Sequence, residues 1–212
     1  MNTNTLKVAG GILGLAMGSV VGVQQASAAI IAVAGQTTWL LAPPVSCMPG
    51  ALLGPNAFTW NEKQNLLVAN VQCDMVNNPG NSGGAVPGLV SGIIDSHFIH
   101  FEPSTAGLNA NGMVKFAGKI RGVIFRQIFL DITDIPLGAP ATTYPTGNPL
   151  RGLNASSFFQ INNNMLQFHF VGQIPPPDLL ELRVLTEHVV PAPGSLALIG
   201  LGGLVAARRR RV

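Results

Sequence analysis

The sequence predicts an all-β fold, a single antiparallel β-sandwich of a jelly-roll-like or similar kind, over residues 29–188. Two observations predict it. Asn, Gly and Pro are abundant in this region and cluster between short apolar runs, which is typical of strands joined by tight turns. No helical pattern of the length needed for a crossover between parallel strands separates these runs. We expect an N-terminal signal helix before the sandwich and a short C-terminal transmembrane helix after it.

The candidate strands follow one another along this region as apolar or alternating runs. They cover residues 36–41, 66–72, 89–94, 96–101, 114–116, 119–130, 157–161, 165–171 and 179–188. The run 119–130 is apolar on both faces, as expected for a central strand or for one that crosses two sheets. Residues 74–88 are predicted to be a loop, because turn-forming residues dominate them.

The clearest alternation is in the second strand of a predicted hairpin, residues 165–171. Side chains of a strand point to opposite faces in turn, so Leu166, Phe168 and Phe170 should point into the core. Gln167 and His169 should then point outward.

The first 28 residues have the pattern of a cleavable signal peptide. Lys7 precedes an apolar stretch over residues 8–23, which is short and rich in glycine. Small residues follow at Ala26 and Ala28, and cleavage is expected just before Ala29. We therefore predict export through the Sec translocon. An N-terminal anchor that is never cut is the alternative interpretation.

The last 24 residues, 189–212, form a second distinctive segment. A Pro-x-Pro motif, Pro191, Ala192 and Pro193, stands before an apolar segment at residues 195–207. A basic cluster then follows, made of Arg208, Arg209, Arg210 and Arg211. A helix of this length rises only about 20 Å, against roughly 30 Å of hydrocarbon, so it is a marginal membrane span. The arginines should remain cytoplasmic and leave the preceding domain outside.

A Pro-x-Pro motif, a short apolar helix and a terminal basic cluster together resemble the PEP-CTERM sorting signal. The resemblance implies recognition by an exosortase-type transpeptidase, which removes the tail and transfers the protein from a membrane-anchored intermediate to the cell surface or extracellular matrix. The family's usual middle residue is Glu, whereas this chain has Ala192. The same motif is also catalogued as an ice-binding protein C-terminal motif, a label that describes the tail. An ordinary tail anchor is the alternative.

The positive charge of the chain comes from its two ends. Without Lys7 and the four terminal arginines, seven basic residues face nine acidic ones, a net charge of −2. A nucleic-acid-binding protein needs a basic patch or stripe. The composition therefore argues against a nucleic-acid partner.

Cys47 and Cys73 are the two cysteines of the chain. An even number of cysteines in an exported chain predicts a disulfide between them. Metal binding is the other interpretation, but no CxxC spacing and no neighbouring histidine supports it. We predict no metal and no cofactor.

Ser82 lies in a Gly-Asn-Ser-Gly-Gly run at residues 80–84, which resembles the run around the nucleophile of chymotrypsin-like proteases. In that family the catalytic His and Asp precede the Ser. All four histidines of this chain follow Ser82, so the topology does not fit. An ordinary turn is the favoured interpretation, and no catalytic residue is predicted.

His100 and Glu102 are a candidate ligand site, because they share one face of a predicted strand. Two side chains are too few to define a metal or ligand site, and the alternative interpretation is that His100 is a structural residue held by hydrogen bonds. Trp39, Trp60 and Tyr144 are the aromatic residues suited to stacking on sugar rings, although tryptophan in a small β-domain is mostly core. The sequence thus favours a non-catalytic adhesive or structural surface protein. The alternatives are a module that binds glycan or exopolysaccharide, and a secreted hydrolase.

Overall fold

The computed structural model describes residues 30–105, 107–173 and 178–190, and within them the chain is mostly β-structure. The strands are β1 Ile30–Gly35, β2 Thr37–Trp39, β3 Leu53–Gly54, β4 Ala57–Asn61, β5 Leu66–Cys73, β6 Gly80–Asn81, β7 Gly88–Pro103, β8 Asn109–Phe116, β9 Ile120–Ile124, β10 Phe158–Asn162, β11 Met165–Val171 and β12 Leu180–Glu187. The helices among the described residues are the 3-10 helix η1 Ser82–Gly84 and the α-helix α1 Gln127–Leu137. The predicted signal peptide and the sorting tail from Pro191 onward lie outside the described residues.

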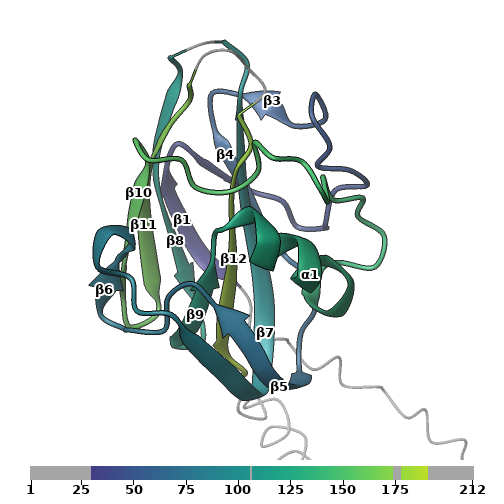
Figure 1. The fold of residues 1–212 in the computed structure, drawn as a ribbon, viewed down its shortest axis with the longest axis vertical. Helices are drawn as coiled ribbons and strands as arrows, with labels where there is room; N and C mark the ends of the chain where they lie inside the picture. Colours follow the sequence, from purple (N-terminus) through teal and green to yellow (C-terminus); the bar gives the residue numbers. More distant parts are fainter. Residues whose placement is uncertain (1–29, 106, 174–177, 191–212) are drawn as a thin grey trace, which may run out of the picture.

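Two sheets face each other (Figure 1). One has five strands in the order β1-β8-β11-β10-β6. The other has seven, with the order β2-β4-β7-β12-β9, and β3 and β5 also pair with the long strand β7. The all-β prediction is therefore confirmed in its coarse form. The sheets are not purely antiparallel, because β2 pairs with β4 and β3 pairs with β7 in parallel.

The main hydrophobic core lies between the sheets. Its five-stranded side includes Val114 of β8 and Phe170 of β11, and its seven-stranded side includes Ile99 of β7 and Leu182 of β12. The predicted inward residues Leu166, Phe168 and Phe170 are all buried, whereas Gln167 is exposed. The predicted alternation of the hairpin strand is thus confirmed.

A second core covers the outer face of the seven-stranded sheet. Trp60, Phe98 and Leu185 pack there against Leu130 and Leu137 of α1. Strand β12 and the part of β7 from Ile94 onward are therefore buried on both faces, since alternate residues enter the two cores. Figure 1 shows α1 lying beside these strands on the side away from the five-stranded sheet.

The predicted strand over residues 119–130 is wrong in its second half. Strand β9 ends at Ile124, and α1 begins at Gln127. Between them, the Asp74 carboxylate accepts hydrogen bonds from the backbone N–H groups of Phe125 and Arg126, at 2.7 and 2.8 Å. These bonds take the place of ladder partners, so the strand stops and the chain turns into the helix.

The structure also differs from the sequence-based strand limits elsewhere. β7 runs without interruption through Asp95 and so joins the two separate strands predicted at residues 89–94 and 96–101. β1 was not predicted, and it pairs antiparallel with β8 at the edge of the five-stranded sheet. Within the predicted loop 74–88, the short strand β6 extends the same sheet by pairing with β10.

The predicted disulfide is absent, because Cys47 and Cys73 are both free and buried. Each thiol has its own surroundings: the Cys47 Sγ lies 3.5 Å from the carbonyl of Thr143, and the Cys73 Sγ lies 3.8 Å from that of Val71. Burial raises the pKa of the Cys73 thiol to about 12 and also raises the pKa of Cys47. Both residues therefore act as small core side chains.

Candidate functional site

Ser82 opens the 3-10 helix η1, next to the edge strand β6. The Asn81 side chain caps this helix by accepting a hydrogen bond from the N–H of Gly84 at 2.9 Å. The Ser82 hydroxyl accepts a hydrogen bond from the N–H of Phe159, at 3.2 Å. The Gly-Asn-Ser-Gly-Gly run thus has the contacts of an Asn-capped turn.

All four histidines lie in the described part of the chain, and each is hydrogen-bonded to a side chain other than Ser82. The pairs are His97 with Asn61 and Thr186, His100 with Glu181, His169 with Asn111, and His188 with Asp95. A nucleophilic serine needs a base within hydrogen-bond reach. The structure describes no such base at Ser82.

His100 and Glu102 lie on the same face of β7, as the alternation predicts, and both are fully buried. His100 Nδ1 bonds to Glu181 at 2.9 Å, and Glu102 Oε1 accepts from the N–H of Gly50 at 2.7 Å. His100 Nε2 and Glu102 Oε2 have no partner in the described structure. Among the described residues no group of three His, Cys, Asp or Glu side chains could hold a metal ion.

Next to this pair, a network of buried ions joins α1 to the seven-stranded sheet. Arg183 of β12 donates to both oxygens of Glu62, at 2.8 and 2.9 Å, and to Asp134 of α1, at 3.0 Å. Arg151 binds Asp134 through two nitrogens, at 2.6 and 2.8 Å, and also binds Glu181. The network therefore fixes α1 on the sheet from several directions.

The electrostatics of this network favour the charged form of Asp134. Burial alone would raise the pKa of Asp134, but the hydrogen bonds and positive charges of Arg151 and Arg183 outweigh it and lower that pKa. Burial, followed by the negative charge of Glu62, raises the pKa of the Tyr144 hydroxyl. Tyr144 therefore remains a hydrogen-bond donor, and it donates to Glu62 at 2.5 Å. We assign this network a structural role.

The three aromatic residues proposed as sugar platforms do not lie flat on an exposed groove. Trp60 is fully buried in the second core, and Trp39 is half-buried against the main core. The indole Nε1 atoms of both are buried. Tyr144 is held in the ion network. A glycan site built on these rings is not supported.

The outer face of the five-stranded sheet offers a different kind of surface. Its five strands contain no acidic residue, and Lys115 is their one Lys or Arg. Gln160 of β10 lies between Asn81 of β6 and Gln167 of β11 in register, and all three side chains are exposed. This arrangement places a row of carboxamide groups across three strands. We call this surface the amide face.

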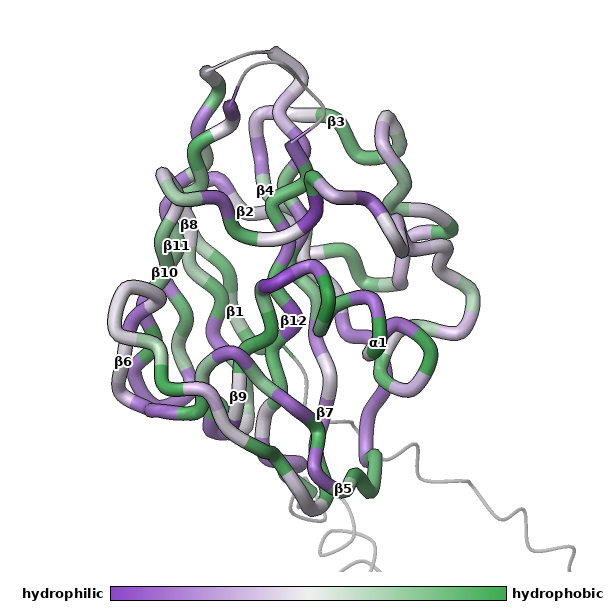
Figure 2. The backbone as a smooth tube through the Cα atoms, viewed as in Figure 1, coloured by the Kyte–Doolittle hydropathy of each residue, from purple (hydrophilic) through white to green (hydrophobic). Residues whose placement is uncertain are grey.

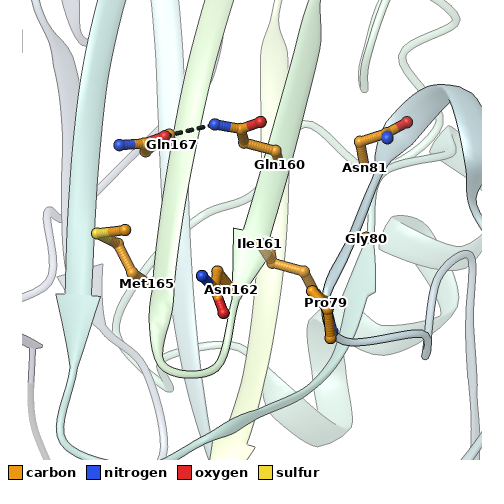
Figure 3. A pocket seen from close by; sticks show the side chains of 8 residues that line it. All are labelled: Pro79, Gly80, Asn81, Gln160, Ile161, Asn162, Met165 and Gln167. Carbon is orange, nitrogen blue, oxygen red and sulfur yellow. Dashed lines mark hydrogen bonds between the residues drawn. The ribbon is translucent and has the colours of Figure 1, made fainter.

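A shallow cavity of about 330 Å³ lies on the amide face (Figure 3). Its lining residues are Pro79, Gly80, Asn81, Gln160, Ile161, Asn162, Met165 and Gln167. Figure 3 shows the Gln160 amide directed toward that of Gln167, to which its Nε2 donates a hydrogen bond. Asn81 faces them from β6. Each carboxamide presents both donors and an acceptor, so the cavity suits a neutral partner rich in hydroxyl groups.

An exposed aromatic ring adds to the same face. Phe158 of β10 is 53% exposed, and its ring centroid lies 5.3 Å from that of His169 on β11. His169 is hydrogen-bonded to Asn111 of β8, so these three side chains form a row parallel to the amide row. The predicted outward position of Gln167 and His169 was the sequence signal for this face. The contribution of β6 could not be seen in the sequence, because residues 80–81 read as a turn.

The comparisons with known proteins concern the tail. The family model of the PEP-CTERM protein-sorting motif matches residues 189–211, so the expected sorting signal is confirmed. The chain therefore carries a PEP-CTERM sorting domain, which implies export, a membrane-anchored sorting tail and processing by an exosortase-type enzyme. No curated protein and no solved structure matches the chain significantly. Among the described residues, no helix has the length and apolar character to cross a membrane.

Proposed function

We propose that this protein is an exported, non-catalytic protein of the cell surface or extracellular matrix that adheres to neutral polysaccharide through its amide face. The observation that carries the proposal is the row formed by Asn81, Gln160 and Gln167 beside the exposed ring of Phe158. Carboxamides hydrogen-bond to sugar hydroxyls without requiring charge, and an aromatic ring offers apolar area to a sugar face.

The electrostatics of the amide face favour a neutral ligand over an acidic one. An acidic polymer would be bound by a cluster of Lys and Arg side chains. The strands of the amide face supply Lys115 alone. A neutral, hydroxyl-rich polymer is therefore the ligand class that fits best.

Binding without catalysis is supported by the contacts of Ser82, whose hydroxyl accepts from a backbone N–H, and by the histidines, which are bonded elsewhere. Sorting of the protein to the surface or matrix would place the amide face among extracellular polysaccharides. A secreted hydrolase stays the less favoured alternative.

Affinity electrophoresis of the processed protein in gels containing neutral or acidic polysaccharides tests the proposal. We expect retardation by a neutral polysaccharide and a clear loss of retardation in the double variant Gln160→Ala/Gln167→Ala. Both side chains are exposed, so the substitutions should change stability by no more than about 0.5 kcal/mol.

The matched control is Gln127→Ala, which removes a carboxamide from α1 on the other side of the molecule. This variant should be retarded like the wild type. Equal retardation of the double variant and the wild type, or retardation by acidic polymers only, would contradict the proposal.

A further inference from the structure

Strand β12 leads from the domain into the sorting tail, and its end defines one end of the molecule. Glu187, its last residue, lies level with Ile94 of β7, which in turn lies level with Leu66 of β5. The N–H of Glu187 also bonds to the carbonyl of Lys119, at 2.8 Å. Four segments therefore meet in one row where the chain leaves the domain, at the lower end of the view in Figure 1.

Apolar side chains are exposed immediately beyond this row. Leu67 and Ile93 are direct partners across β5 and β7, and they are 82% and 53% exposed. The chain itself adds Val189 and Val190, of which the latter is 61% exposed. Figure 2 shows hydrophobic residues around the β5 label at this end. An exposed Leu–Ile pair across two strands, together with two exposed valines that follow the end of β12, indicates an interaction surface.

Exposed basic side chains lie in the segments that lead to and follow the contact of Lys119 with Glu187. Lys115 lies near the end of β8, Lys119 lies in the turn after it, and Arg121 follows in β9. One exposed acid, Glu187, lies in the same region, with its carboxylate 3.9 Å from Arg121. The rest of the processed domain is acidic, so positive charge is concentrated near the end that carries the tail. Apolar residues with neighbouring Lys and Arg side chains are typical of a surface that rests on phospholipid.

The length of chain that follows Val190 limits how far this end can be from a membrane. Four residues, 191–194, separate Val190 from the apolar segment that begins at Ser195. A fully extended chain covers at most about 18 Å over the five residue steps from Val190 to Ser195. The headgroup region on each side of a bilayer is about 5–8 Å thick, so Val190 can lie no more than about 13 Å beyond it. While the tail is anchored, the end of β12 therefore lies close to the lipid surface.

We propose that the surface made of Leu67, Ile93, Val189 and Val190, with Lys119 beside it, rests on the phospholipid bilayer while the tail is uncut. We call it the membrane-facing end. Contact there would hold the domain in a defined orientation on the membrane. Removal of the tail would take away the tether that keeps this weakly apolar surface on lipid.

A site-specific fluorescence experiment on the full chain tests the proposal. The protein is reconstituted in vesicles of phosphatidylcholine and phosphatidylglycerol after labelling of Leu67→Cys or Ile93→Cys with an environment-sensitive dye. Cys47 and Cys73 are buried, so the dye should react at the introduced thiol. The control is Ile132→Cys on α1, which replaces an equally apolar and exposed residue at a different place on the fold.

The expected result is a blue shift of the dye at positions 67 and 93, and loss of its emission when the lipids carry nitroxide groups. The dye at position 132 should show neither change. The proposal is overturned if positions 67 and 93 behave like position 132 in these vesicles. It is equally overturned if they become shielded only when the processing enzyme is present, because the partner would then be a protein.

Discussion

Replacement of Arg183 by Met should be among the most damaging substitutions in the domain. The Arg183 and Glu62 side chains are fully buried, and the guanidinium also binds Asp134, Thr133 Oγ1 and the carbonyl of Leu130. Met would fill much of the space but leave two buried carboxylates short of a cation. Loss of one partner of a buried ion pair costs about 3–5 kcal/mol. For a domain of this size, that cost corresponds to a melting temperature about 6–20 °C lower.

Thermal and urea unfolding of the processed protein, followed by circular dichroism, measures this cost. Arg121→Met is the matched control, because Arg121 forms an exposed pair with Glu187 at 3.9 Å, worth about 1 kcal/mol or less. Arg183→Lys should fall between the two, since an ammonium keeps the charge but cannot reproduce the two parallel bonds to Glu62. If Arg183→Met and Arg121→Met lose equal stability, the ion network does not hold α1 as described.

Three further predictions concern His97, the two cysteines and Gly112. Burial lowers the pKa of His97 to about 3, against a value near 6.5 in the unfolded chain. Between these two pH values the unfolded chain binds a proton that the folded protein does not. The free energy of unfolding should therefore fall by up to about 1.4 kcal/mol per pH unit as the pH drops from about 6.5 to about 3. Urea melts across this range should show a smaller slope for His97→Gln, and equal slopes would refute the assignment. Cys47 and Cys73 should resist alkylation until the protein is denatured, and a mass that rises by two hydrogens on reduction would show a disulfide instead. Gly112→Ala should cost about 1–3 kcal/mol in urea melts, because its Cβ would lie 2.4 Å from a ring atom of a core phenylalanine. Gly83→Ala, whose Cβ has room, should cost much less, and equal losses would count against the packing described.

The alternation of side chains along the sequence was enough to predict several of the strands. Residues 165–171 form β11 with the limits expected, and 179–188 contains β12. The alternation also placed His100 and Glu102 on one face of β7. Each of these predictions depends on the period of two within a strand, which is a local property.

The helix α1 could not be predicted in the same way, because its buried face is partly polar. Thr133 and Asp134 are buried, while Ile128, Ile132 and Ile135 point to solvent. Such a face becomes stable only because Arg151 and Arg183, which are remote in the sequence, supply charge and hydrogen bonds to it. The apolar pattern of this segment therefore predicted a strand, whereas its tertiary contacts with the two arginines stabilise a helix.

The amide face was predictable only in part for a similar reason. Alternation directs Gln167 outward from β11, but the neighbouring carboxamide of Asn81 comes from a two-residue strand inside a turn-rich segment. Its register with Gln160 depends on contacts between segments about 80 residues apart. Sequence pattern alone therefore indicated single polar positions and not the row that they form.

Cell fractionation combined with C-terminal peptide mapping of the native protein tests the sorting signal and its processing. We predict that the mature form is found at the cell surface or in the extracellular matrix. It should have lost the apolar segment of the tail together with Arg208, Arg209, Arg210 and Arg211. Recovery of a mature protein that still ends in the arginine cluster and remains in the membrane fraction would contradict this prediction.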